Sequence, residues 1–323
     1  MRYVNLGRTA LRVSPICLGT LNLGVRTTRE EGLALMDRAL EEGVNFFDTA
    51  NHYGWQVHKG FTEELIGEWF ARGGGRRERV VLGTKVFHPM TDLPNDGGLS
   101  ARHIIASCEA SLRRLRTDCI DLFQMHHIDR TAPWQEVWQA METLVRQGKI
   151  RYVGSSNFAG WHLAAAQGEA GRRNFLGIVS EQCVYNLVTR HAEMELIPAA
   201  RAHGIGVLAW SPLHGGLLGG ALAKLRRGTA VKSAQGRAQV ALEHHTDTIA
   251  SYEKFCAELG REPADVAHSW LLSRPGVTAA VIGPRTTDHL TRALTALDDP
   301  LDAEVSTHLD ELFPPPAATP WTD

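Results

Sequence analysis

Four side chains that can hold or move a proton stand at related places in the sequence. Asp48, Lys85 and His126 each lie at the end of, or directly after, a short apolar run. Tyr53 lies five residues past Asp48, in the connection that follows the same run. If these runs are neighbouring parallel strands of a barrel, their carboxyl ends converge on one face and bring the four side chains together.

This set of residues suits proton transfer to a substrate oxygen. A tyrosine phenol titrates near pH ~10, and a nearby ammonium favours the phenolate and lowers that pKa. Asp48 would keep Lys85 charged and oriented, while His126 would donate a hydrogen bond to the same substrate oxygen. General acid catalysis of this kind contributes roughly 10²–10⁴-fold. The hydride that completes a carbonyl reduction must come from a cofactor.

Short apolar runs alternate with longer amphipathic segments along the whole chain, which predicts parallel βαβ units. The predicted strands are Ile16–Leu18, Phe46–Asp48, Val80–Thr84, Ile120–Met125, Tyr152–Ser155, Ile178–Gln182, Val207–Trp210 and Ala279–Ile282. Eight such units within 323 residues favour an α/β fold with one closed (β/α)8 TIM barrel spanning residues 1–323. A glycine turn near the start of the chain predicts an N-terminal β-hairpin.

Amphipathic periodicity predicts helices in most gaps between these strands. They cover about 28–42, a segment capped by Ser100 that runs to Leu115, and residues 137–145, 161–167, 193–203, 247–259, 265–272 and 288–297. Two long connections, 86–99 and 213 to about 245, follow strand ends and are expected on the active-site face. A Phe-Pro-Pro-Pro stop at residue 313 predicts a loose tail over about 314–323.

The composition excludes several classes of function. The formal net charge of −2 implies no attraction to nucleic acid or to an anionic membrane. The N-terminus lacks the apolar core of a signal peptide, and no apolar stretch is long enough to span a bilayer, so a cytoplasmic protein is expected. The five cysteines form no C-x-x-C pair, which argues against a disulfide framework or a zinc ribbon.

The chain resembles the aldo-keto reductases over nearly its full length. The resemblance rests on the segments 48–54 (DTANHYG), 83–85 (GTK), 124–126 (QMH), 154–158 (GSSNF), 210–213 (WSPL) and 282–285 (IGPR). It implies a catalytic tetrad of Asp48, Tyr53, Lys85 and His126, with Tyr53 as the proton donor and NADP(H) as the cofactor. Within the family, the chain resembles the bacterial branch that includes reductases of nucleotide-linked keto-sugars, and it also resembles potassium-channel β-subunit-like proteins.

The resemblance also implies the contacts to the cofactor. The expected set is Gly19, Thr20, Asp48, Ser156, Asn157, Gln182, Trp210, Ser211, Pro212, Leu213, Gly215, Leu217, Gly283, Arg285 and His289. Ser156, Asn157 and Gln182 match the residues that hold the nicotinamide carboxamide. Trp210 matches the ring that stacks on the nicotinamide.

At the adenine end, Arg285 resembles the cation that grips the 2′-phosphate, and it precedes a predicted helix N-terminus that also favours phosphate. Asp288 is expected to cap that helix and so to point away from the phosphate. The chain departs from the family pattern at His289 and Ala293, where Gln and Asn are usual. This departure concerns the adenine end alone.

The leading interpretation is reduction of a small aldehyde, ketone or keto-sugar, with Trp55, His88 and His127 lining the substrate pocket beside Tyr53 and His126. Homo-oligomerisation is left open. An alternative from another class is a cofactor-binding regulatory subunit of a channel-like partner, because such relatives keep the tetrad. The cofactor motifs disfavour a metal-free lyase or isomerase.

Metal and glycosidase chemistry are also disfavoured. The pairs His126–His127 and His244–His245 occur without a metal-binding motif, so no catalytic metal is expected. A barrel glycosidase needs two carboxylates at strand ends, and Glu181 is the one suitable glutamate in this sequence.

Overall fold

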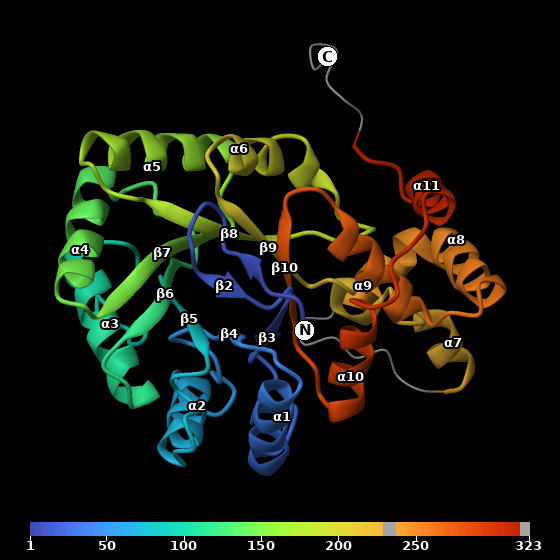
Figure 1. Cartoon of the computed structure of the whole chain (residues 1–323), viewed down its shortest axis with the longest axis horizontal. Coiled ribbons are helices and arrows are strands. Elements are labelled where there is room, and N and C mark those ends of the chain that lie inside the picture. The colour runs from blue at the N-terminus through green and yellow to red at the C-terminus, as the bar shows by residue number, and fades with distance from the viewer. Residues whose placement is uncertain (229–236, 317–323) are drawn as a thin grey trace.

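The computed structural model describes residues 1–228 and 237–316. At its centre is a closed barrel of parallel strands in the order β10-β3-β4-β5-β6-β7-β8-β9, with helices around it (Figure 1). The barrel strands are β3 (Ile16–Gly19), β4 (Phe46–Asp48), β5 (Val81–Val86), β6 (Ile120–Met125), β7 (Ile150–Ser156), β8 (Ile178–Val184), β9 (Gly206–Trp210) and β10 (Val277–Ile282). The predicted (β/α)8 barrel is confirmed.

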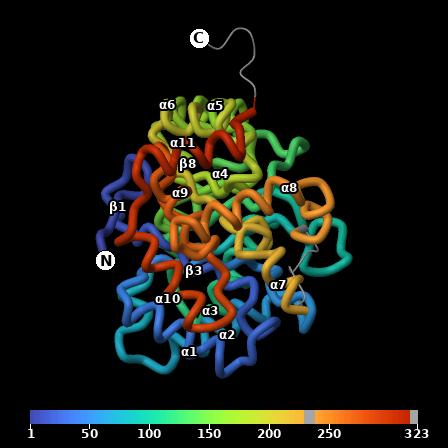
Figure 2. Tube along the Cα trace, turned by 90° about the vertical axis from the view of Figure 1, so that its right-hand side faces the viewer, coloured from blue at the N-terminus to red at the C-terminus, as the bar shows by residue number. Residues whose placement is uncertain are grey.

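Helices follow the strands in alternation. They are α1 (Arg29–Glu41), α2 (Phe61–Ala71), α3 (Ala101–Leu115), α4 (Trp134–Arg146), α5 (Gly160–Arg172), α6 (Leu196–Ala202), α7 (Ala221–Arg226), α8 (Arg237–Glu258), α9 (Pro263–Ser273), α10 (Thr287–Thr295) and α11 (Ala303–Leu312), with short 3-10 turns η1 (His191–Glu193) and η2 (His214–Gly216). Helices α7 and α8 lie outside α9, on one side of the barrel (Figures 1 and 2).

The predicted N-terminal hairpin, β1 (Val4–Asn5) paired with β2 (Arg12–Val13), closes the amino end of the barrel. Leu6 and Val13 are fully buried in the inner barrel core with strand residues such as Phe46. Gly7 has φ 54, and a Cβ there would lie 2.5 Å from the carbonyl oxygen of Val179. Only glycine fits this approach. The carboxyl ends of the strands are therefore the open face of the barrel.

Three helices, α2, α7 and α11, form where the sequence predicts none. Helix α2 begins after Gly60, which has a φ of 93 and no side chain that could cap the helix, so no capping signal marks it. Buried Leu65, Ile66 and Trp69 stabilise α2 through packing instead. Helix α11 does carry a signal, because the Asp302 side chain accepts a hydrogen bond from the backbone N–H of Val305.

In its described parts, 213–228 and 237–245, the segment after β9 is not one long loop as predicted, and residues 229–236 lie outside the described residues. It contains η2 and α7, and α8 begins at Arg237, with a non-helical residue at His245. The predicted helix over 193–203 is divided into η1 and α6. The connection 87–99 is irregular as expected. Of the predicted tail, 314–316 are irregular, and 317–323 lie outside the described residues.

Within residues 1–228 and 237–316, the structure has no helix that combines the length and the apolar character needed to cross a bilayer.

Candidate active site

A buried ion pair forms the floor of the open face. The Lys85 ammonium donates to Asp48 Oδ2 and, over 2.9 Å, to the carbonyl oxygen of Thr49. The two charged side chains are 0% and 2% exposed, so each depends on the other for compensation. Lys85 lies inside β5, whereas the sequence placed it after the strand. The pairing with Asp48 allows this lysine to remain within a buried strand.

The second oxygen of Asp48 is also satisfied. Gln124 Nε2 donates to Asp48 Oδ1 over 2.8 Å, and Gln182 Nε2 donates to the same atom over 3.0 Å. These donors come from β6 and β8, so strands from different parts of the barrel fix one carboxylate. The orientation of Lys85 is thereby fixed as well.

Tyr53 stands over this pair, with Lys85 Nζ 5.1 Å from its ring centroid. Burial raises the pKa of the Tyr53 phenol, and the opposing charge of Lys85 does not cancel that effect. The net direction is therefore upward, opposite to the lowering predicted from a nearby lysine alone. A raised pKa keeps the phenol protonated at neutral pH, which is the form that can donate a proton.

Lys85 and His126, two other titratable groups beside Tyr53, differ in charge at neutral pH. Burial would lower the pKa of Lys85, but Asp48 and Tyr53 outweigh it, and the pKa is raised. Burial, followed by the charge of Lys85, holds the pKa of His126 well below its ordinary value. At neutral pH, Lys85 is therefore a cation, and His126 is a neutral imidazole that can form hydrogen bonds.

A cleft of about 1590 Å³ opens above the tetrad. It exceeds the ~300–1,000 Å³ usual for one small ligand, so it has room for a dinucleotide and a substrate. The predicted cofactor and substrate residues line it with one exception, Leu217, which is fully buried in the apolar core. Lys85 lies beneath the floor, and Glu181 is fully buried behind it, away from the lining.

Polar groups at the ends of β7 and β8 link the predicted carboxamide site to the tetrad. Ser156 Oγ donates to the carbonyl oxygen of Gln182 over 2.8 Å. Asn157 Nδ2 donates to the carbonyl oxygen of His126 over 3.0 Å, and Asn157 holds φ 60. A left-handed asparagine in this position turns the chain back over the cleft. The set fits an amide ligand beside the tetrad.

The segment after β9 bends sharply across the cleft. Ser211, His214 and Gly215 have φ values of 57, 47 and 68. The backbone N–H of Gly215 donates to Ser211 Oγ over 3.1 Å, and Asn186 Nδ2 donates to the carbonyl oxygen of Ser211 over 3.0 Å. This tight, glycine-rich turn offers backbone rather than bulky side chains to a diphosphate.

At the far end of the cleft, cations gather around α10. Burial and then the charge of Arg285 lower the pKa of both Arg26 and Lys224. Three mutually repelling cations are suited to an anionic ligand. Arg26 and Lys224 were missed by the sequence analysis, because neither belongs to a recognisable motif and α7 was not predicted.

Thr286, rather than Asp288 as predicted, caps α10. Its side chain accepts a hydrogen bond from the backbone N–H of His289 over 3.2 Å. Asp288 is exposed and pairs with Arg292 across 3.6 Å. Asp288 was expected to point away from a bound phosphate, and its pairing with Arg292 on the same helix is consistent with that expectation.

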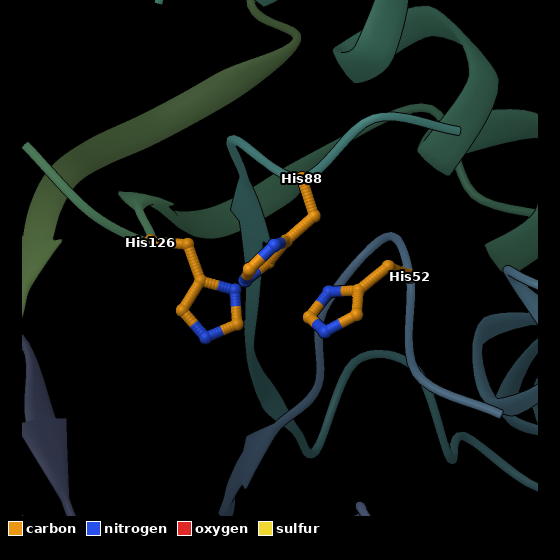
Figure 3. A group of neighbouring side chains, drawn as sticks. All are labelled: His52, His88 and His126. Atoms are coloured by element: carbon orange, nitrogen blue, oxygen red, sulfur yellow. The ribbon is translucent and has the colours of Figure 1, made fainter. Parts of the chain in front are cut away.

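Aromatic rings surround Tyr53 on the substrate side. The His52 ring stacks on Trp55 at 5.4 Å, and His126 stacks on His127 at 5.1 Å. His88 contacts both His52 and His126 (Figure 3). His52 was not among the predicted pocket residues, although its position directly before Tyr53 was an available signal.

A parallel barrel whose open face holds a tyrosine over a buried lysine–aspartate pair defines a class of barrel oxidoreductases. Residues 15–313 match the model of the Aldo/keto reductase family, and the chain belongs to that family. It is therefore an oxidoreductase of a family that acts on carbonyl compounds with nicotinamide cofactors.

Similar proteins cover almost the whole chain. A Bacillus subtilis protein described as the uncharacterized oxidoreductase YrpG is 52% identical, over 98% of this chain and 97% of the relative. A probable voltage-gated potassium channel subunit beta of Oryza sativa subsp. japonica is 33% identical over 92% of each chain. The versiconal hemiacetal acetate reductase of Aspergillus parasiticus is 31% identical over 99% of each chain.

Proposed function

We propose that this protein reduces a small aldehyde, ketone or keto-sugar to an alcohol with NADPH, and that Tyr53 supplies the proton. The observation that carries the proposal is the position of Tyr53, which faces the cleft while Lys85 lies 5.1 Å behind its ring. Asp48 compensates Lys85, and neutral His126 lines the same cleft. A proton donor, a charge that stabilises its conjugate base and a neutral hydrogen-bonding group thus meet at one point.

The roles of the residues follow from these contacts. NADPH, when bound, supplies the hydride that the carbonyl carbon receives. Tyr53 gives its phenolic proton to the carbonyl oxygen, and the ammonium of Lys85 stabilises the phenolate that remains. His126 orients the carbonyl oxygen through a hydrogen bond. Asp48 keeps Lys85 charged until the Tyr53 phenolate regains a proton from solvent.

The preference for NADPH over NADH would arise at the cationic end of the cleft. Arg285 is exposed there and makes no hydrogen bond or ion pair with another described residue. Lys224 and Arg26 add positive charge at the same place. A charge-assisted hydrogen bond to the 2′-phosphate contributes about 1.5–3 kcal/mol, enough for a preference of about tenfold or more.

A screen of NADPH consumption against aldehydes, quinones and keto-sugars tests the reaction, with Tyr53→Phe as the matched variant. The variant keeps the ring and loses the acid, so turnover should fall about 10²–10⁴-fold. Fluorescence titration should show that it still binds NADPH. Equal turnover in the two proteins would remove Tyr53 from the role of proton donor.

A regulatory role is the second candidate, because relatives from two plants are named probable channel subunits. Under that role the cleft binds NADPH but no carbonyl compound accelerates its oxidation. Tight NADPH binding without turnover across the whole screen would favour the regulatory role over the enzymatic one.

A further inference from the structure

Three histidines from separate connections turn their rings toward one another on the substrate side of the cleft (Figure 3). His52 follows β4, His88 follows β5 and His126 follows β6. One ring nitrogen of each lies within 4.8 Å of the corresponding nitrogens of the other two. The ring centroids are 4.0 Å apart for His52 and His88, and 4.9 Å apart for His88 and His126. The three rings therefore share one small volume.

Two of these rings carry a buried nitrogen that nothing satisfies. In the described part of the chain, the Nδ1 atoms of His52 and His126 are buried and have no hydrogen-bond partner. His126 as a whole is 8% exposed. A buried polar atom without a partner is uncommon in folded proteins and calls for an explanation. A ligand that accepts nitrogen lone pairs would satisfy both atoms at once.

The protonation state of the rings supports such a ligand. Burial, then neighbouring histidines and lysines, lowers the pKa of His52 to about 3. Burial and His127 lower the pKa of His88 to about 4. Neutral imidazole is the form that binds metal ions. At neutral pH, protons do not compete for these lone pairs.

We propose that His52, His88 and His126 form a site for one divalent transition-metal ion of the Zn²⁺ type. An imidazole set without a carboxylate suits Zn²⁺, Cu²⁺, Ni²⁺ and Co²⁺, whereas Mg²⁺ and Ca²⁺ require oxygen ligands. Zinc–nitrogen bonds of ~2.0–2.1 Å place tetrahedral ligand nitrogens ~3.3–3.4 Å apart. The ring nitrogens, which lie within 4.8 Å of one another here, must therefore come closer on binding, and half-buried His52 and His88 lie in the irregular connections that follow β4 and β5. Three protein ligands leave the fourth position open.

The surrounding charges limit the strength of this site. Lys85 acts on His52 and His126, but Asp48 compensates its charge. Lys59 also acts on His52 and His88, and its ammonium donates to the carbonyl oxygen of Pro89 over 2.7 Å. These lysines make the ion easier to remove than one in a cysteine-rich structural site. A direct titration is therefore the suitable test.

The site goes beyond the proposed carbonyl reduction and does not depend on it. Because His126 belongs to both, an ion held there and a substrate oxygen compete for this ring. Metal binding can be measured without any turnover, so the metal site and the carbonyl reduction can be tested independently.

The test is calorimetric titration of the chelator-treated full-length protein with Zn²⁺, beside Cu²⁺ binding followed by electron paramagnetic resonance. We expect one ion per chain, nitrogen hyperfine structure from the imidazoles with Cu²⁺, and no binding of Mg²⁺. The chain contains 15 histidines, so a His52→Ala/His88→Ala double variant measures binding elsewhere. Zn²⁺ binding by the wild type that matches this double variant would overturn the proposal.

His127 provides a matched control, because its ring stacks on His126 at 5.1 Å but does not belong to the group of three. His88→Ala should weaken Zn²⁺ binding by at least about tenfold, whereas His127→Ala should leave it unchanged. Circular dichroism and NADPH titration establish that each variant is folded. An equal loss in both variants would contradict the assignment of His88 as a ligand.

Discussion

The two ends of the cleft are built in opposite ways. At the tetrad end, both oxygens of Asp48 are bonded and Lys85 is fully buried, so the charges are fixed before any ligand arrives. At the opposite, cationic end, Arg285 is exposed and unpaired among the described residues, close to two other cations. Fixed charges suit chemistry, which depends on preorganisation. Exposed cations suit recognition, which the ligand itself completes.

The largest effect should come from breaking the fixed end. Lys85→Met leaves the Asp48 carboxylate buried without its counter-charge, which should lower the free energy of unfolding by about 3–5 kcal/mol. Denaturant titration measures this change. The double variant Lys85→Met/Asp48→Asn removes both charges and should recover a good part of the loss. A single variant as stable as the wild type would contradict the view that this end is fixed by charge pairing.

At the cationic end, Arg285→Ala should raise the KM for NADPH about tenfold or more, as expected for a lost charge-assisted contact. The KM for NADH should change little, because NADH lacks the 2′-phosphate. Arg292→Ala is the control, since Arg292 already pairs with Asp288 on the same helix. A wild type that uses both cofactors equally well would end the proposal of NADPH preference.

Buried Glu181, which bonds residues next to the tetrad end of the cleft, should make the stability of the protein depend on pH. It is fully buried, accepts the backbone N–H of Phe158 over 2.9 Å, and bonds Ser155 Oγ. Burial raises its pKa from 4.5 to about 8. Between these values the folded protein holds a proton that the unfolded chain has lost, so stability falls as pH rises toward 8.

We expect the free energy of unfolding to be lower at pH 6.5 than at pH 5 by on the order of 1–2 kcal/mol from this group. Glu181→Gln keeps a neutral side chain of similar shape and should flatten that slope. Parallel unfolding curves of both proteins across this pH range make the comparison. If the slope persists in Glu181→Gln, another group is responsible.

The smallest effect concerns Trp210, which lies between the two ends. Trp210→Ala removes a stacking surface of about 0.5–1.5 kcal/mol, so NADPH should bind a few-fold more weakly and lose fluorescence quenching. Trp55 also lines the cleft, on the substrate side, and Trp55→Ala should leave NADPH affinity intact. If Trp55→Ala weakened NADPH binding more than Trp210→Ala did, Trp55 rather than Trp210 would be the stacking residue.

The sequence predicts the fixed end better than the exposed end, for a physical reason. Buried strands leave apolar runs of clear length, and polar residues at their ends stand out, as Asp48 and His126 do. Arg26 and Lys224 are ordinary surface residues in the sequence and become neighbours only through the fold. The three-histidine group is hidden in the same way, because its members come from three connections with no common spacing.

Helices are likewise predicted well where the local sequence carries a signal and poorly where they depend on tertiary packing. Helix α1 carries a full capping box at Thr28 and Glu31, and the predicted bounds match it closely. Helix α2 begins at a glycine and relies on tertiary packing, so its local sequence signal is weak. Leu217, an expected cofactor contact, is fully buried in the apolar core, and its side chain does not line the cleft.

The closure of the barrel joins the first and last parts of the chain. Ile16 pairs with Ala280 where β3 meets β10, and the hairpin at Gly7 rests against Val179 and Gly204. During synthesis on the ribosome, the amino-terminal segment thus emerges long before its neighbours exist. Contacts so distant along the chain are slow to form, and the nascent protein must keep β3 unpaired on one side until nearly the whole chain has been made.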